Sequence, residues 1–260
     1  IGSGKIVVGR DINVPSQMIK RSLTTGLMAA GANVVDFGIA PIPVIHYGKD
    51  FYNAKTMVTI TKSHLRPEEV DIKIFSDHEI PLQSHPKEVP WDQIGNLQYV
   101  YEYRDIYMRG ILKQADKNDI EEKGFLLVLD AKEDETFIPK ILKKIGCDTV
   151  LIGSIDVQSA DDFPEPSPKR ISLVSELTTA IGGDMGVVLD NDGDRVVFID
   201  HQGDVIREQT VLSIFAKYAL KDNPQGNIIS SIVASQSLEE TVADCGGHLI
   251  KTSVNDVLKE

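Results

Sequence analysis

Three aspartates alternate along the run Asp-Asn-Asp-Gly-Asp-Arg, which spans residues 190–195. Carboxylates held this close repel one another unless a cation or a proton relieves the repulsion. A hard divalent cation such as Mg2+ takes oxygen ligands, and side chains at i, i+2 and i+4 of a loop can converge on one point. We therefore predict that Asp190, Asp192 and Asp194 hold Mg2+. Arg195 follows at once, and a guanidinium fork beside a metal suits a phosphate group.

Two other interpretations of this run are a solvated acidic turn and an EF-hand loop. An EF-hand also has Asp at positions 1, 3 and 5, but it requires Gly at position 6 and Glu at position 12. Here position 6 is Arg195 and position 12 is His201, which argues against an EF-hand. The apolar runs 186–189 and 196–199 indicate short buried strands on both sides, and they weigh against a solvated turn without excluding it.

A second candidate for chemistry is Ser63, which follows a predicted strand at residues 56–61. In open α/β sheets, functional groups gather beyond the carboxyl ends of the strands. A serine among cationic groups could act as a nucleophile or a phosphate carrier, and the alternative is a turn serine that caps the next segment. The cationic residues near it in the sequence are Lys62, His64, Arg66 and Lys73.

Apolar residues alternate between strand and helix patterns along the chain, which predicts an α/β fold with mixed, largely parallel sheets. The predicted strands are residues 5–9, 33–38, 56–61, 125–130, 149–153, 186–189, 196–199 and 227–233, with another starting at 249–250. The predicted helices are residues 15–30, 41–52, 99–112, 137–145, 171–181, 209–220 and 238–243. Polar stretches suggest consecutive domains at residues 1–117 and 118–203, followed by a partial third domain at 204–260.

Composition limits the partners that we expect. The net charge of the 260 residues is −12, so neither a nucleic acid nor an anionic membrane is an expected partner. The two cysteines, Cys147 and Cys245, begin apolar segments. We expect them to be reduced core residues of a cytoplasmic protein. No apolar run approaches the length of a membrane span, and no signal peptide is visible. The first residue is Ile1, so we expect the chain to be trimmed at its start.

Taken together, these motifs resemble those of the α-D-phosphohexomutase family, which includes phosphomannomutase, phosphoglucomutase and phosphoglucosamine mutase. The family's phosphoserine loop reads T-A/G-S-H-N-P and is followed by N-G-x-K; Thr61-Lys62-Ser63-His64 fits the first, and Lys73 falls at the lysine. The family's metal loop reads D-G-D-G-D-R, and the run at 190–195 differs from it at one glycine. The order and spacing of the motifs agree over nearly the whole chain.

The resemblance implies a mutase that moves a phosphoryl group between the 1- and 6-positions of a hexose phosphate. Ser63 would carry the phosphoryl group and pass it to the sugar, giving a bound hexose 1,6-bisphosphate. The phosphorylated Ser63 would also supply one ligand to the Mg2+. The partners implied are therefore hexose phosphate and hexose 1,6-bisphosphate, and a homo-oligomer is left open.

The resemblance also implies roles for the remaining candidate residues. Arg195 and Lys73 would supply positive charge and proton transfer. Arg10 would anchor the serine loop from the neighbouring turn. For His64, a local hydrogen bond and a catalytic role are left as alternatives.

Several positions depart from the family pattern. Leu65-Arg66 replaces Asn-Pro, and Val70-Asp71 replaces Asn-Gly. The turn at 131–135 is acidic and lacks glycine. A third loop, which contains Asn255, also differs from the family pattern. The family's sugar-reading loop and its C-terminal phosphate-binding domain would lie beyond Glu260. The alternative function is therefore a weakened or silent paralogue that binds a sugar phosphate or a protein partner.

Overall fold

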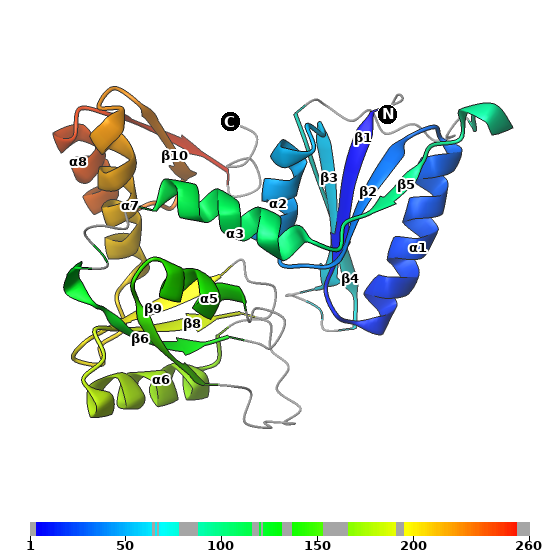
Figure 1. Ribbon diagram of the computed structural model, residues 1–260. Coiled ribbons are helices and arrows are strands. Elements are labelled where there is room, and N and C mark those ends of the chain that lie inside the picture. Colours follow the sequence, from blue (N-terminus) through cyan, green and yellow to red (C-terminus); the bar gives the residue numbers. More distant parts are fainter. Residues whose placement is uncertain are drawn as a thin grey trace. The chain divides into compact units, whose positions relative to one another are not determined.

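The computed structural model describes residues 4–63, 66, 68–77, 88–115, 120, 122–131, 137–152, 166–190 and 195–253. The chain forms two compact units, Ile1–Gly203 and Asp204–Glu260. The first unit contains two separate sheets with helices packed on them, and the second contains a smaller sheet (Figure 1). The predicted α/β class, with mixed and largely parallel sheets, is confirmed.

The first sheet has five strands in the order β4-β3-β1-β2-β5. Its central strands β3, β1 and β2 are parallel, β5 adds to β2 in parallel, and β4 pairs with β3 in the antiparallel sense. The strands are β1 (Lys5–Arg10), β2 (Asn33–Ile39), β3 (Thr56–Lys62), β4 (Val70–Ser76) and β5 (Leu97–Tyr99). The helices are α1 (Val14–Ala29), α2 (Ile42–Phe51) and α3 (Tyr103–Gln114), with a short 3-10 turn at Trp91–Gln93.

The two faces of this sheet carry separate cores, because successive side chains of a strand point to opposite faces. Ile6 and Val8 of β1 pack under α1, together with Val58 and Ile60 of β3. Val7 of β1 and Met57 of β3 lie in the core under α2. Figure 1 shows α1 and α2 on opposite sides of the sheet, so each strand residue can be assigned to one face.

Two strands of this sheet, β4 and β5, were not predicted from the sequence. The aromatic residues at 99–112 predicted one helix, but Tyr99 ends β5 and the helix begins only at Tyr103. β5 is a three-residue edge strand, too short for alternation to be visible, and its register with Val34 of β2 defines it. β4 is also an edge strand, and two of its isoleucines, Ile72 and Ile74, are half exposed.

The second sheet has four strands in the order β7-β6-β8-β9, of which only β8 and β9 are antiparallel neighbours. Its strands are β6 (Leu126–Asp130), β7 (Asp148–Ile152), β8 (Met185–Leu189) and β9 (Val196–Asp200). Its helices are α5 (Phe137–Lys144) and α6 (Pro168–Ile181), which lie on opposite faces (Figure 1). Val128, Val174, Val188 and Ile199 form the core under α6. The strands predicted on both sides of residues 190–195 are therefore confirmed, as a hairpin.

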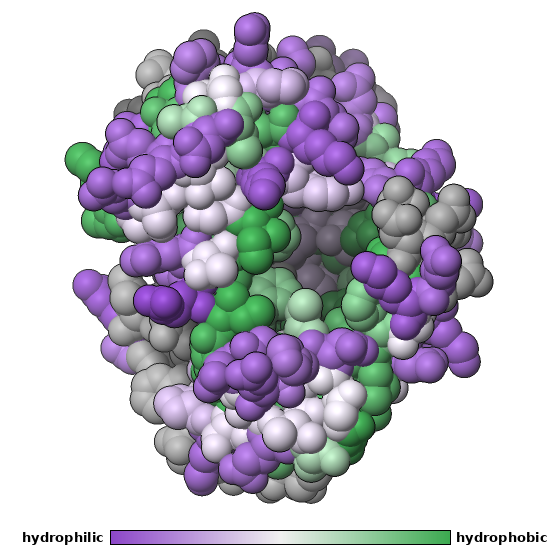
Figure 2. Space-filling view, turned by 90° about the vertical axis from the view of Figure 1, so that its left-hand side faces the viewer, coloured by the Kyte–Doolittle hydropathy of each residue, from purple (hydrophilic) through white to green (hydrophobic). Residues whose placement is uncertain are grey.

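The second unit contains α7 (Glu208–Asp222), β10 (Asn227–Ser231), α8 (Gln236–Asp244) and β11 (His248–Thr252). The two strands are parallel, and Ala216, Leu220, Leu238 and Val242 form the core between the helices. Large apolar side chains remain exposed along α7, and hydrophobic residues interrupt the hydrophilic covering on the face drawn in Figure 2. Among the described residues, no helix is both long enough and apolar enough to cross a membrane.

Candidate functional site

Ser63 lies directly after β3, at the carboxyl end of a parallel strand, as the sequence predicted. The residue is 4% exposed. Its backbone N–H donates to the carbonyl of Glu69 at 3.0 Å, and the N–H of Arg66 donates weakly to its Oγ at 3.4 Å. These contacts hold the hydroxyl within the short connection between β3 and β4.

Hydrogen bonds of Asp11 connect the carboxyl end of β1 to the carboxyl end of β3. Its Oδ2 accepts a hydrogen bond from the backbone N–H of Lys62 at 2.6 Å, and its own N–H donates to the Ile60 carbonyl at 3.1 Å. Oδ1 accepts from the N–H of Asn13 at 3.0 Å, which fixes the carboxylate in a local turn. Hydrogen bonds to an ionised acceptor are stronger than neutral ones. Asp11 therefore positions the residue immediately before Ser63, a role that sequence reasoning missed although Asp11-Ile-Asn13 is a common turn signal.

The role of Arg10 as an anchor of the serine loop stays a prediction, and the geometry places this residue on one face of the sheet. Arg10 pairs in register with Ile60, whose side chain lies in the core under α1, and paired residues of neighbouring strands share a face. Its Nη1 donates to the carbonyl of Asp11 at 2.6 Å. Arg10 thus supports the turn from the α1 face, while Asp11 makes the contact with the β3 end.

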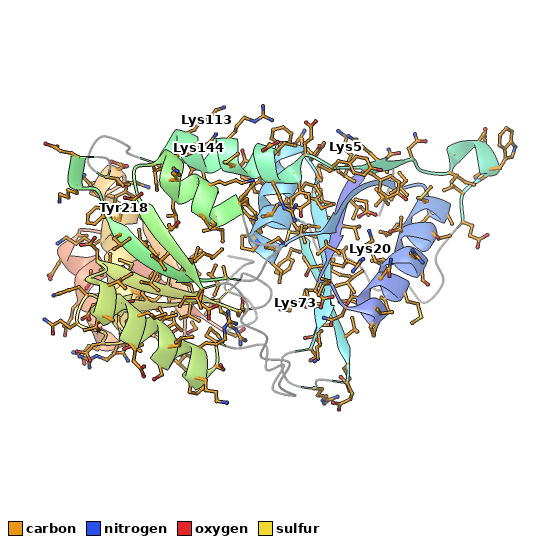
Figure 3. The ribbon with its side chains drawn as sticks, turned by 60° about the horizontal axis from the view of Figure 1, so that its bottom comes forward. Lys5, Lys20, Lys73, Lys113, Lys144 and Tyr218 are labelled. Atoms are coloured by element: carbon orange, nitrogen blue, oxygen red, sulfur yellow. The ribbon has the colours of Figure 1, made fainter. Side chains whose placement is uncertain are left out.

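Lys73 lies on β4, opposite Thr59 of β3. Thr59 alternates with Ile60, so both it and Lys73 are on the α2 face of the sheet. Figure 3 shows Lys73 on this edge strand. Ser63 lies four residues further along than Thr59, which corresponds to roughly 13 Å between Cα atoms at the usual rise of a strand. The ammonium can approach Ser63 only with its side chain extended along the sheet.

The other cations near Ser63 are less informative. Arg66 forms an exposed ion pair with Glu69 at 2.9 Å, so its charge is already matched. Exposed pairs of this kind contribute little to stability. His64 lies outside the described residues.

Asp190 and Arg195 mark the two ends of the β8–β9 hairpin loop. The N–H of Asp190 donates to the carbonyl of Arg195 at 3.1 Å, which closes the loop. Asp190 is 1% exposed, whereas Arg195 is exposed. Asp192 and Asp194 lie outside the described residues, so the structure brings together only these two members of the predicted set.

A further carboxylate lies at the same edge of this sheet. Asp130 ends β6, is 6% exposed, and accepts a hydrogen bond from Nε of Arg170 at 2.5 Å. The Ser167 side chain caps the α6 helix that carries this arginine. The charge of Asp130 is therefore matched within the protein, and this pair could not be predicted from the sequence because its members are 40 residues apart.

Asp190, the described aspartate of the predicted ligand set, has a side chain that suits a hard cation. Within the described parts of the chain, no three His, Cys, Asp or Glu side chains form a cluster that could hold a metal ion. Asp190 contributes a carboxylate at the mouth of the loop that contains Asp192 and Asp194. A buried carboxylate is favourable only with positive charge or hydrogen-bond donors nearby, and carboxylate oxygens are ligands that suit Mg2+.

Comparison with known proteins places both halves of the first unit in one family. Residues 2–92 match the family model described as phosphoglucomutase/phosphomannomutase, alpha/beta/alpha domain I. Residues 105–203 match the model for alpha/beta/alpha domain II of the same family. The two matched ranges contain Ser63 and the run at 190–195, respectively.

Curated relatives and a solved structure resemble almost the entire chain. A Pyrococcus abyssi protein named "Probable phosphoglucosamine mutase" is 28% identical over 99% of this chain and 59% of its own length. A phosphoglucomutase/phosphomannomutase of Thermococcus kodakarensis is 29% identical over 97% of this chain and 59% of its own length. The crystal structure of a phosphoglucomutase/phosphomannomutase family protein from Burkholderia thailandensis has a TM-score of 0.72 at 23% identity, covering 98% of this chain and 59% of that one.

This chain thus spans 59% of the length of the two curated relatives, with domains I and II in the expected order. The solved structure supports the same fold at lower identity. The chain belongs to the phosphoglucomutase/phosphomannomutase family.

Proposed function

We propose that this chain provides the phosphoryl-transfer part of a phosphohexomutase. The observation that carries the proposal is Ser63, buried at the carboxyl end of β3 and tied to β1 through Asp11, in a chain of this family. The full reaction would move a phosphoryl group between the 1- and 6-positions of a hexose phosphate through a bound hexose 1,6-bisphosphate.

Ser63 is the proposed carrier of the phosphoryl group. A sugar hydroxyl of a hexose 1-phosphate attacks the phosphorus of phospho-Ser63, the Ser Oγ–P bond breaks, and a sugar O–P bond forms. The proton of the attacking hydroxyl passes to a nearby base. After the bisphosphate turns over, Ser63 takes back the other phosphoryl group by the reverse step. Such transfers depend mainly on positioning and on neutralising the phosphoryl oxygens.

Positive charge is the second requirement of this reaction. Asp190, Asp192 and Asp194 are the proposed Mg2+ ligands, and the bound ion would act as a Lewis acid on the phosphoryl oxygens. Arg195 and Lys73 are the proposed cationic side chains of this chain. Arg195 is exposed at the end of the hairpin, and Lys73 is partly exposed on the edge strand β4.

A silent paralogue is the second candidate function. It is favoured by the connection after β3, where Arg66 occupies the position of the family's proline and its N–H contacts the Ser63 hydroxyl at 3.4 Å. A serine that is 4% exposed must become accessible before it can take a phosphoryl group. If this connection does not open, the fold would persist as a binding protein without transfer.

Thermal unfolding with and without Mg2+ tests the metal-dependent part of the proposal. A cation that binds only the folded state stabilises it, by about 2.7 kcal/mol at a concentration 100 times its Kd. We expect Mg2+ to raise the melting temperature of the wild type and of Asp92→Asn, an exposed control. Asp192→Asn should lose most of the rise. No rise in the wild type would contradict the metal assignment and favour the silent paralogue.

A further inference from the structure

A pocket of about 310 Å3 lies between α1, β2 and β5. Its walls include Arg10, Lys20, Arg21, Thr24, Asp36 and Tyr99. Figure 3 shows Lys20 between α1 and the sheet. The pocket is on the α1 face, whereas Lys73 is on the α2 face, and Arg10 is the lining residue that is also among the predicted transfer residues.

An ion pair between two buried residues lines the pocket. Lys20 is 8% exposed and Asp36 is 4% exposed. The Lys20 ammonium donates to both carboxylate oxygens, at 2.5 Å to Oδ1, which also accepts from the N–H of Gly38 at 2.7 Å. An ammonium has three N–H donors, and Asp36 takes two of them. The acceptors of the pair are therefore engaged, while one lysine donor has no partner within the described part of the chain and is left for a ligand.

The arginines make the pocket electropositive. Among the described lining residues, Arg10, Lys20 and Arg21 stand against the carboxylate of Asp36, so cations outnumber anions by two in a chain of net charge −12. Burial is the main cause that lowers the pKa of Arg10; Asp11 and Asp36 raise it, and the charge of Arg21 lowers it by the smallest contribution. A bound anion would offset the repulsion between the two guanidinium groups. Each guanidinium carries five N–H donors, and within the described residues Arg10 uses one, to the Asp11 carbonyl.

Thr24 supplies an independent sign of a polar ligand. The residue is 6% exposed and lines the pocket, and its hydroxyl has no hydrogen-bond partner among the residues that the structure describes. An unpaired buried hydroxyl is costly, and buried polar groups are normally paired with protein, water or a ligand. A hydroxyl can donate or accept, so rotation toward the pocket would let it join the lysine and arginine donors.

We propose that this pocket binds a small phosphomonoester. Its excess of two positive charges matches a dianion, and arginine forks suit phosphate oxygens. The volume is at the lower end of the range of small-molecule sites, which favours a compact metabolite. The inference does not depend on transfer at Ser63, because the residues involved belong to the opposite face of the sheet.

Titration of the isotope-labelled chain with glycerol 3-phosphate, followed by amide NMR shifts, tests the proposal. We expect saturable shifts at residues of α1 and β5. Arg21→Ala should weaken binding at these residues about tenfold or more, since a hydrogen bond to a charged group is lost. Thr24→Val should also weaken it, while Arg109→Ala, an exposed arginine of α3, should leave it unchanged. Succinate, a dicarboxylate of the same charge, should bind more weakly.

The outcomes separate this site from the transfer site. Ser63→Ala should keep the shifts at α1 and β5, even if it abolishes phosphorylation. Absence of saturable shifts at these residues in the wild type would overturn the proposal, as would equal affinity in Arg21→Ala and the wild type. Equal affinity for succinate would overturn the assignment to phosphate.

Discussion

Replacing Asp11 by alanine should loosen the end of β3 that leads to Ser63. The change removes the acceptor of three hydrogen bonds, from the N–H of Lys62 at 2.6 Å, the N–H of Asn13 at 3.0 Å and Nδ2 of Asn13 at 2.7 Å. Hydrogen bonds to charged groups contribute about 1.5–3 kcal/mol each when buried. Asp11 is only partly buried, so water replaces some of them, and we expect a total loss of about 2–3 kcal/mol.

Hydrogen exchange and urea unfolding measure this effect. Exchange should accelerate at the amides of residues 60–63, and the free energy of unfolding should fall. Asp50→Ala is the matched control, because Asp50 is 70% exposed and its ion pair with Lys49 is long, at 3.8 Å. Asp11→Asn keeps a carbonyl acceptor and should give an intermediate loss. Unchanged exchange at residues 60–63 in Asp11→Ala would refute the assignment of Asp11 as the anchor.

Three further predictions concern the sheets and the cysteines. Asp36→Ala should lower the free energy of unfolding by about 3–5 kcal/mol in urea titrations, because it leaves the buried Lys20 ammonium without its partner. The double variant with Asp36→Ala and Lys20→Met should recover part of the lost stability. Gly186→Ala should lower stability by about 1–3 kcal/mol in thermal unfolding, since an added Cβ would lie 2.7 Å from a valine methyl of α6; full stability would contradict the packing. Cys147 should react with iodoacetamide more slowly than Cys245 in peptide mapping at pH 8. Burial, followed by nearby carboxylates, raises the pKa of Cys147 and keeps its thiol protonated. Equal reaction rates of the two cysteines would contradict the burial of Cys147.

Central strands were predictable from the sequence because both of their faces are apolar. The strand before Ser63 and the hairpin around residues 190–195 were both recognised from such runs. The edge strands β7 and β9 of the second sheet were also predicted, whereas the edge strands β4 and β5 of the first sheet were missed. β4 exposes Ile72 and Ile74 at the margin of the sheet, and β5 is three residues long, so neither shows the pattern of a buried strand.

The parts of the site that depend on register could not be read from the sequence. Arg10 and Asp11 are neighbours, yet strand alternation directs Arg10 to the α1 face and leaves Asp11 to bind the β3 end. The pairs Lys20–Asp36 and Asp130–Arg170 join elements that meet only after folding. Motif spacing indicated where chemistry is concentrated, but packing decides which side chains share a face.

Phosphorylation of Ser63 is the most direct test of the proposed function. The chain is incubated with glucose 1,6-bisphosphate, with and without Mg2+, and examined by intact-mass measurement and peptide mapping. Ser63→Ala removes the proposed carrier, and Ser76→Ala, at the far end of β4, is the control serine. We predict one added phosphate on Ser63 that requires Mg2+, is absent in Ser63→Ala and persists in Ser76→Ala. Phosphate on another residue, or none on Ser63 with the donor and Mg2+ at saturating concentrations, would contradict the proposal.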